Sequence, residues 1–220
     1  MLRVNPQVRA LARETVRTVN TPFARRRTTN VLDRAPRPLK VEIGGLAARD
    51  GWVVTNVNAT ARNYLDATAT WPLEDAAAEL VYADNVIEHI TLDQARRMLR
   101  ESHRCLQPGG VIRLVTPDLR AHVELYLSGR EAVTSPAGNY YRNVGLVVEH
   151  PVDLVRIPIA SFGHHTGYLY DFETLEHELQ AAGFRDVVRC EQGESTHPEL
   201  KGLDQSREGG SQVVVEATRP

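Results

Sequence analysis

The sequence predicts an α/β protein with a doubly wound, mostly parallel sheet. Short apolar runs typical of buried strands alternate with segments of helical periodicity, which is the pattern of βαβ units. One helix-to-strand turn is marked by Pro108-Gly109-Gly110, because glycine supplies positive φ and the residue before proline is biased away from helix. The following apolar run stops at Thr116-Pro117-Asp118. Open α/β sheets place their ligand-contacting loops at such carboxyl ends of strands.

The individual elements follow from local patterns. Apolar residues recur at helical spacing over residues 92–106, and Thr91 precedes them as an N-cap. A second helix is expected over residues 172–182, ended by Gly183. Residues 64–75 indicate a short strand-and-turn region. Apolar runs predict the strands, at residues 39–43, 53–57, 80–83, 111–115, 184–190 and 212–217.

Composition limits the class of protein. A chain of 220 residues with 42% hydrophobic residues fits one substantial globular domain. The net charge of −2 gives no general attraction to nucleic acid, and no apolar run reaches the length of a membrane span. Two distant cysteines suggest neither a disulfide framework nor a metal site, so a cytoplasmic location is the default. A homo-oligomer stays open.

Charge divides the chain into two parts. The first forty residues hold ten arginines and lysines against only Glu14 and Asp33. We expect a basic helix or arm over residues 1–38, with a short helix at 7–19 and an arginine-rich linker up to Pro38. The main domain would span 39–220. Residues 120–165 fit strand–helix alternation poorly, so we expect an insertion there that forms a lid or substrate loop.

Two blocks of sequence carry a family resemblance. They are Asn85-Val-Ile-Glu-His-Ile90 and Arg104-Cys-Leu-Gln-Pro-Gly-Gly110. Their order resembles the class I S-adenosylmethionine-dependent methyltransferases, in which Leu-Glu-His, a helix and Arg-x-Leu-Lys-Pro-Gly-Gly join two strands. The resemblance covers about residues 39–217. It implies a Rossmann-like methyltransferase sheet ending in an antiparallel hairpin, with S-adenosylmethionine as cofactor and S-adenosylhomocysteine as product.

The resemblance also implies a branch and a kind of acceptor. Gly51-Trp52 and the element Gly163-His164-His165…Tyr170-Asp171 are similar to the type 11-like, polysaccharide- and sugar-associated methyltransferases. That similarity implies O-methylation of a small molecule or a saccharide-containing metabolite. A polar loop at residues 191–205 resembles one in the same branch, although a plain surface loop explains it equally well.

Cofactor-binding residues are assigned from the same resemblance. The family's acidic-x-Gly-x-Gly loop stands here as Glu42-Ile-Gly44-Gly45-Leu46, with leucine in place of the second glycine. Asn56 and Asn58 stand where an acidic residue usually accepts from the ribose, and Asn58 is the better match. The resulting cofactor-binding set is Glu42, Gly44, Gly45, Asn58, Asp66 (beside the adenine), Asn85 and His89.

Catalysis requires positioning and a base. Methyl transfer is an in-line displacement at a sulfonium carbon, and a hydroxyl acceptor needs a group that takes its proton. Asp118 follows the strand at the ligand-binding edge, and either His164 or His165 matches the family's histidine. Asp171 equally suits a helix cap. Paired histidines also suit a metal, but no third ligand stands at a suitable spacing, so we expect none.

Two alternatives follow from departures and absences. Leu46 and the missing acidic ribose partner favour a catalytically inactive methyltransferase-fold protein that binds or scaffolds. A nicotinamide-dependent oxidoreductase would need Gly-x-Gly-x-x-Gly between strand and helix, and Gly44-Gly45-Leu46 does not supply it.

Overall fold

One mixed sheet organises the computed structural model, which describes residues 21–58, 61–204 and 211–220. The strand order is β2-β1-β3-β4-β6-β5. The first four strands are parallel, whereas β6 runs antiparallel to both β4 and β5. The predicted fold class and the C-terminal antiparallel hairpin are therefore confirmed. The strands are β1 Leu39–Ile43, β2 Val53–Thr55, β3 Ala78–Asp84, β4 Leu106–Pro117, β5 Arg185–Cys190 and β6 Gln212–Thr218.

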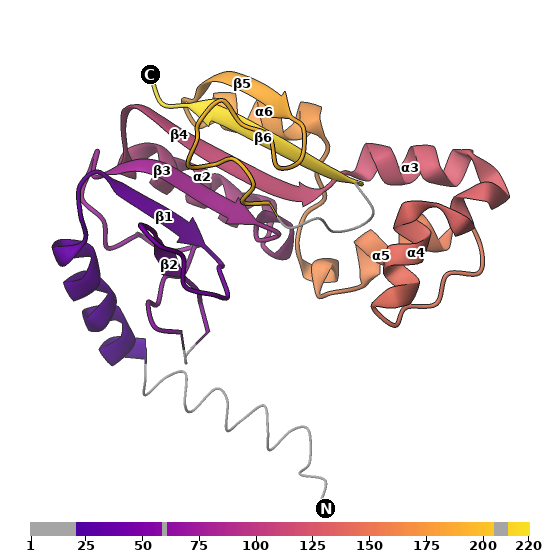
Figure 1. Ribbon diagram of the computed structural model, residues 1–220, viewed down its shortest axis with the longest axis horizontal. Helices are drawn as coiled ribbons and strands as arrows, with labels where there is room; N and C mark the ends of the chain where they lie inside the picture. Colours follow the sequence, from indigo (N-terminus) through magenta and orange to yellow (C-terminus); the bar gives the residue numbers. More distant parts are fainter. Residues whose placement is uncertain (1–20, 59–60, 205–210) are drawn as a thin grey trace, which may run out of the picture.

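Some helices pack on the sheet, and another group of helices lies apart from it, beyond one end of the sheet. Figure 1 shows α3, α4 and α5 together beyond the tip of β4, away from the sheet. Thr91 caps α2 through a capping box with Gln94, as the sequence predicted in part. The helices are residues 21–34, η1 Ile87–His89, α2 Leu92–Cys105, α3 Leu119–Leu127, η2 Gly129–Thr134, α4 Pro136–Asn143, α5 Asp153–Ala160, η3 His164–Thr166 and α6 Phe172–Ala181. None of these described helices is long and apolar enough to cross a membrane.

Alternation along the strands divides the core between the two faces of the sheet. In β3, Val81 belongs to the larger cluster and Tyr82 to the smaller one, because successive side chains point to opposite faces. The larger cluster also receives Met98 from α2 and Leu175 from α6. The smaller cluster is covered by loop residues, including Leu200. Between β1 and β2, residues 44–52 contain no helix.

A buried arginine ties that covering loop to the sheet. Arg113, on β4, is fully buried and forms ion pairs with Asp204 and Glu216. Its Nε lies 2.8 Å from Asp204 Oδ1, and its Nη1 donates to the Glu194 carbonyl at 3.0 Å. One guanidinium thus joins β4, β6 and the 191–204 loop.

The N-terminal segment differs from the expectation. Residues 21–34 are helical, so the prediction of an arginine-rich linker there is wrong. Ala24, Thr28 and Leu32 are buried, and Leu32 joins the larger core cluster. These residues recur every fourth position, which places them on one helical face beneath the exposed arginines. The expected helix at 7–19 lies outside the described residues.

The insertion forms a small helical unit with its own core. Tyr141, Leu154 and Ile157 are fully buried in a cluster separate from the sheet. His122 is also fully buried, and its Nε2 lies 2.7 Å from the Tyr141 hydroxyl. The assignment of residues 120–165 as an inserted lid or substrate segment stays a prediction.

Candidate functional site

The loop after β1 requires glycine at two successive positions. Gly44 has φ +78°, and a Cβ there would lie 2.4 Å from Val86 Cγ2. At Gly45, a Cβ would lie 2.4 Å from Val54 Cγ1 and 2.7 Å from Glu42 Oε1. Since contacts below 3.0 Å would force the neighbours to move, the two glycines let the backbone lie close to Val86 after β3, Val54 of β2 and Glu42 of β1.

Side chains from the strand ends hold this loop in place. Glu42 is buried at the end of β1 and pairs with Arg49, with Oε2 and Nε 2.9 Å apart. Asn56 Nδ2 donates to the carbonyls of Gly44 and Gly45 at 3.0 and 3.2 Å. Asn56, which follows β2, therefore fixes the glycine loop, a role that the sequence interpretation missed. Asn58 is exposed, and its backbone N–H donates to Asn56 Oδ1.

A cavity of about 180 Å³ opens beside the glycine loop. It is lined by residues 42–46 of β1 and its loop, and by Asp84 and Asn85 at the end of β3. Asn85 has φ +53°, and its side chain donates to Asp84 and accepts from Gln212. Leu46 is 87% exposed, so its side chain does not fill the cavity.

A larger hollow of about 990 Å³ adjoins this cavity. Both are lined by Gly45 and Leu46, and the larger one continues to Asn56 and Asn58 at the end of β2. The larger hollow also borders residues 27–36 and the start of β1 at Leu39 and Lys40, so it runs along the outer edge of β2. The smaller cavity lies at the carboxyl ends of β1 and β3, where parallel sheets bind their ligands.

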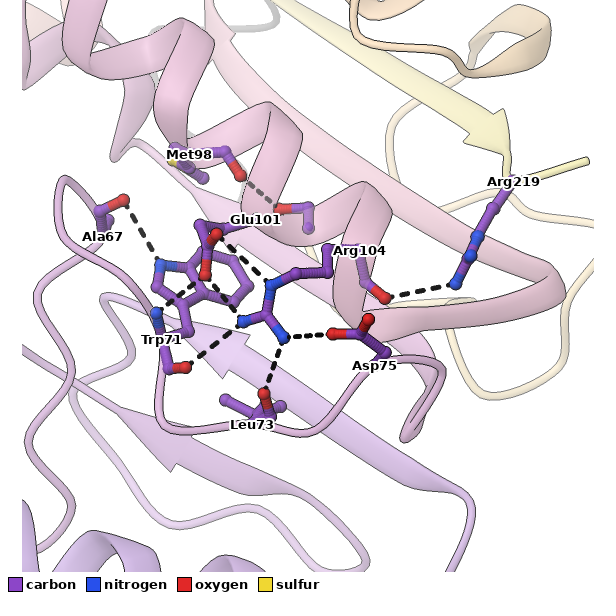
Figure 2. Close-up of polar contacts among 9 residues, drawn as sticks. Ala67, Trp71, Leu73, Asp75, Met98, Glu101, Arg104 and Arg219 are labelled. Carbon is purple, nitrogen blue, oxygen red and sulfur yellow. Dashed lines mark hydrogen bonds and ion pairs between the residues drawn. The ribbon is translucent and has the colours of Figure 1, made fainter.

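Asp66 lies on a loop that is fastened to α2. Its Oδ1 accepts from the backbone N–H and the hydroxyl of Thr68, at 3.0 and 2.7 Å. Figure 2 shows how Arg104 of α2 holds the next part of this loop. Its guanidinium donates to the Trp71 and Leu73 carbonyls and pairs with Asp75.

Glu101 completes the same network. Its carboxylate pairs with Arg104 at 2.7 Å and accepts from the Trp71 backbone N–H at 2.8 Å (Figure 2). The indole N–H of Trp71 in turn donates to the Ala67 carbonyl at 3.3 Å. The position of Asp66 therefore depends on α2, through contacts that lie outside the cavity.

Both carboxylate oxygens of Asp118 contact other residues of the protein. It is 1% exposed and caps α3, where Oδ1 accepts from the Arg120 backbone N–H at 3.0 Å. Its Oδ2 pairs with Arg189 Nη2 at 2.7 Å. This geometry gives Asp118 a positioning role for the insertion. Asp171 likewise caps α6 by accepting from the Thr174 backbone N–H at 2.9 Å.

Histidines from η1 and η3 contact each other. The rings of His89 and His164 are 4.7 Å apart and inclined at 66°. His164 is buried, and its Nδ1 lies 2.9 Å from the Pro158 carbonyl oxygen. Burial lowers the pKa of both histidines, and their mutual repulsion lowers that of His89 further. Both imidazoles are therefore neutral at pH 7.

A buried carboxylate accompanies these rings. Donor atoms of Glu88, His89 and His164 all lie within 4.8 Å of one another. Glu88 is 1% exposed, and its Oε2 accepts from the Thr116 hydroxyl at 3.1 Å. His165 is exposed on the same turn as His164. The sequence interpretation missed Glu88 as a site residue, although its place in the Glu-His block was a signal.

The candidate residues thus fall into three groups: residues that line a cavity, the histidine cluster, and two aspartates outside both. Glu42, Gly44, Gly45 and Asn85 line the smaller cavity, and Asn58 lines the larger one. His89 and His164 form the cluster with Glu88, beside exposed His165. Asp66 and Asp118 are held by contacts of their own.

The match to a protein family agrees with this architecture. Residues 48–114, from the loop after Gly45 to β4, match the family model described as "Methyltransferase domain". This match covers less than half of the chain and contains the Glu-His and Pro-Gly-Gly blocks, on which the resemblance to S-adenosylmethionine-dependent methyltransferases was based. The sugar-associated branch stays a prediction. No curated protein matches the chain.

Solved structures provide distant similarities. One is a Thermotoga maritima S-adenosylmethionine-dependent methyltransferase described as a possible histamine N-methyltransferase, with 18% identity, TM-score 0.47, and coverage of 93% of this chain and 98% of that one. Another is Haemonchus contortus phosphoethanolamine N-methyltransferase 2, with 15% identity, TM-score 0.45, and coverage of 88% and 52%. The methyltransferase SibL has 18% identity, TM-score 0.48, and coverage of 88% and 55%. This chain spans about half the length of the last two. These similarities carry no argument about its acceptor.

Proposed function

We propose that the protein transfers the methyl group of S-adenosylmethionine to a hydroxyl oxygen of a small molecule or a saccharide-containing metabolite. The observation that carries the proposal is the cavity between the Gly44-Gly45 loop and Asn85, at the carboxyl ends of β1 and β3. Its polar lining suits the amino and carboxylate groups of the cofactor's methionine portion. The adjoining hollow along β2, which Asn58 lines, supports a position there for the ribose and adenine.

The chain's own residues would divide the work as follows. Gly44 and Gly45 allow close approach of the cofactor, and Asn56 holds their loop. Asn58 accepts from the ribose through its amide oxygen, and Asp66 lies beside the adenine amino group. Asn85 holds the region where the methionine portion and the acceptor meet.

The proposed reaction is one in-line displacement. The acceptor oxygen attacks the methyl carbon, a new carbon–oxygen bond forms, and the carbon–sulfur bond breaks to leave S-adenosylhomocysteine. The hydroxyl proton passes to a histidine of the 163–166 turn. Exposed His165 suits that transfer, while His164 and Asp118 keep their structural contacts and position the turn and the insertion.

Two measurements test the proposal. Calorimetric titration with S-adenosylhomocysteine should give one site per chain, and extract metabolites incubated with isotopically labelled methyl donor should yield a labelled product. The His165→Ala variant should lose turnover by at least about 100-fold while its affinity for S-adenosylhomocysteine stays within about twofold. Full activity in this variant would remove the proposed base.

A second candidate is a catalytically inactive member of the fold. The missing acidic partner at Asn58 favours it, because an amide accepts from the ribose without charge assistance. Absence of binding heat and of a thermal shift at millimolar S-adenosylhomocysteine would favour this scaffold and refute the enzyme.

A further inference from the structure

We propose that Glu88, His89 and His164 form a binding site for one divalent transition-metal ion of the zinc type. Their donor atoms lie within 4.8 Å of one another. Two imidazole nitrogens and one carboxylate oxygen form a donor set that binds zinc with an open fourth position. The proposal stands on this geometry and does not depend on methyl transfer.

The sequence could not reveal this triad. His164 lies 75 positions after His89 in the chain, and spacing alone offered no third ligand for the paired histidines. Folding places η3 against η1, where Gly167 lies next to the Glu88 backbone. A Cβ on Gly167 would lie 1.8 Å from the Glu88 carbonyl oxygen, so only glycine permits this approach. The close packing brings ligands from the two turns together.

Neighbouring groups orient two of the three ligands. The Pro158 carbonyl can only accept, so His164 Nδ1 carries a proton and Nε2 keeps its lone pair for a metal. The Thr116 hydroxyl donates to Glu88 Oε2 and fixes the carboxylate. Such outer contacts are a recurrent feature of metal sites, because they set the tautomer and orientation of the ligands.

The remaining adjustment is small. Ligand atoms around a tetrahedral zinc ion are about 3.4 Å apart at bond lengths of about 2.1 Å, so the present spacing of up to 4.8 Å must shrink by about 1.4 Å at most. His89 is exposed on a single-turn helix, and rotation of its side chain can supply that movement.

The site would have a use in the proposed reaction. Glu88 follows Asn85 of the smaller cavity by three residues, and the proposed function puts the acceptor near Asn85. A zinc-type ion lowers the pKa of a bound hydroxyl and makes its oxygen a better nucleophile. This consequence rests on the proposed function, whereas the binding site itself does not.

The test uses untagged full-length protein that has been treated with a chelator and dialysed. Calorimetry with Zn²⁺ should give one ion per chain with micromolar or tighter affinity, and Co²⁺ should produce the visible absorption bands of a four-coordinate site. His89→Ala and Glu88→Gln should each weaken Zn²⁺ binding by at least about 100-fold, since each removes one ligand of three. The His165→Ala variant is the matched control, because it alters the same turn and should keep wild-type Zn²⁺ affinity.

Three results would overturn the proposal. They are absence of Zn²⁺ binding at 100 micromolar (about 100 times the expected dissociation constant), equal affinity in wild type and His89→Ala, and a loss of affinity only in His165→Ala. Because His89 is exposed, its substitution should leave thermal unfolding of the metal-free protein unchanged, which separates ligand loss from misfolding. Titration with S-adenosylhomocysteine on the same samples reports the proposed function separately.

Discussion

Arg113 offers the sharpest test of what stabilises the face of the sheet that the 191–204 loop covers. Its guanidinium is fully buried between Asp204, also fully buried, and Glu216, whose side chain is 6% exposed. Arg113→Met would leave two buried carboxylates facing each other without a cation. Removing one partner of a buried ion pair costs about 3–5 kcal/mol, a large part of the stability of a typical domain. Loss of the bond to the Glu194 carbonyl should add to this cost.

Urea unfolding followed by circular dichroism measures the effect. We expect the free energy of unfolding to fall by about 3–5 kcal/mol and the melting temperature to fall by roughly 10 °C. Lys201→Met is the matched control, because Lys201 pairs with Glu194 on the same loop but both side chains are more than half exposed. That variant should lose less than about 1 kcal/mol.

A second variant separates charge from packing. In Arg113→Met/Asp204→Asn/Glu216→Gln all three charges are absent, so most of the lost stability should return. Our reasoning is refuted if Arg113→Met lowers the free energy of unfolding no more than Lys201→Met does, with the same dependence of that free energy on urea concentration. The buried network would then not stabilise this face.

Three further predictions concern the site and the insertion. Gly44→Ala should weaken S-adenosylhomocysteine binding at least tenfold in calorimetry, because Gly44 has positive φ and a Cβ there would clash with Val86. Gly109→Ala is the control: Gly109 has φ +79° and no close neighbour, so this variant should lose stability but keep its affinity. Equal affinities in the two variants would contradict the role of Gly44. Arg104→Met should release the loop that carries Asp66 and weaken S-adenosylhomocysteine binding by about tenfold. Arg100→Met, a change at an exposed residue of the same helix, should leave this affinity unchanged. Similar losses of affinity in both variants would count against the loop argument. Burial lowers the pKa of His122, so the unfolded chain binds more protons between that lowered value and about 6.5. Stability should therefore fall as pH drops through this window, by up to about 1.4 kcal/mol per pH unit for one proton. His122→Phe should show a shallower dependence in urea unfolding at several pH values, and identical slopes would disprove it.

The sheet was predictable because its signals are local. The cap at Thr91 and the apolar run of β4 each act within a few residues, and each is found in the structure. Pro108-Gly109-Gly110, expected as a turn before the strand, instead lie within β4, where its pairing with β3 is irregular. There Gly109 has positive φ, while Gly110 is needed because a Cβ would lie 2.8 Å from the Gln107 carbonyl oxygen.

The rest of the site depends on contacts between distant segments. Asn56 was predictable as a polar residue after a strand, but its two bonds to the glycine loop exist only once β1 and β2 pair. Glu88 and His164 are brought together by the packing of the single-turn helices η1 and η3, which no hydrophobic periodicity in the sequence predicts. For Asp118, position at the strand end suggested chemistry, whereas Arg189, 71 residues later, engages its carboxylate.

Burial of the helix at residues 21–34 changes where the folding unit begins. The density of positive charge falls after Pro38, which makes Pro38 an obvious point at which to truncate the protein. Such a shortened polypeptide would lack Leu32 and leave part of the main apolar cluster open to solvent. It would also lose the Arg27 guanidinium that binds the carbonyls of Ala61 and Arg62, near the β2 edge. The arginine-rich N-terminal segment is therefore part of the folded domain from residue 21 onward.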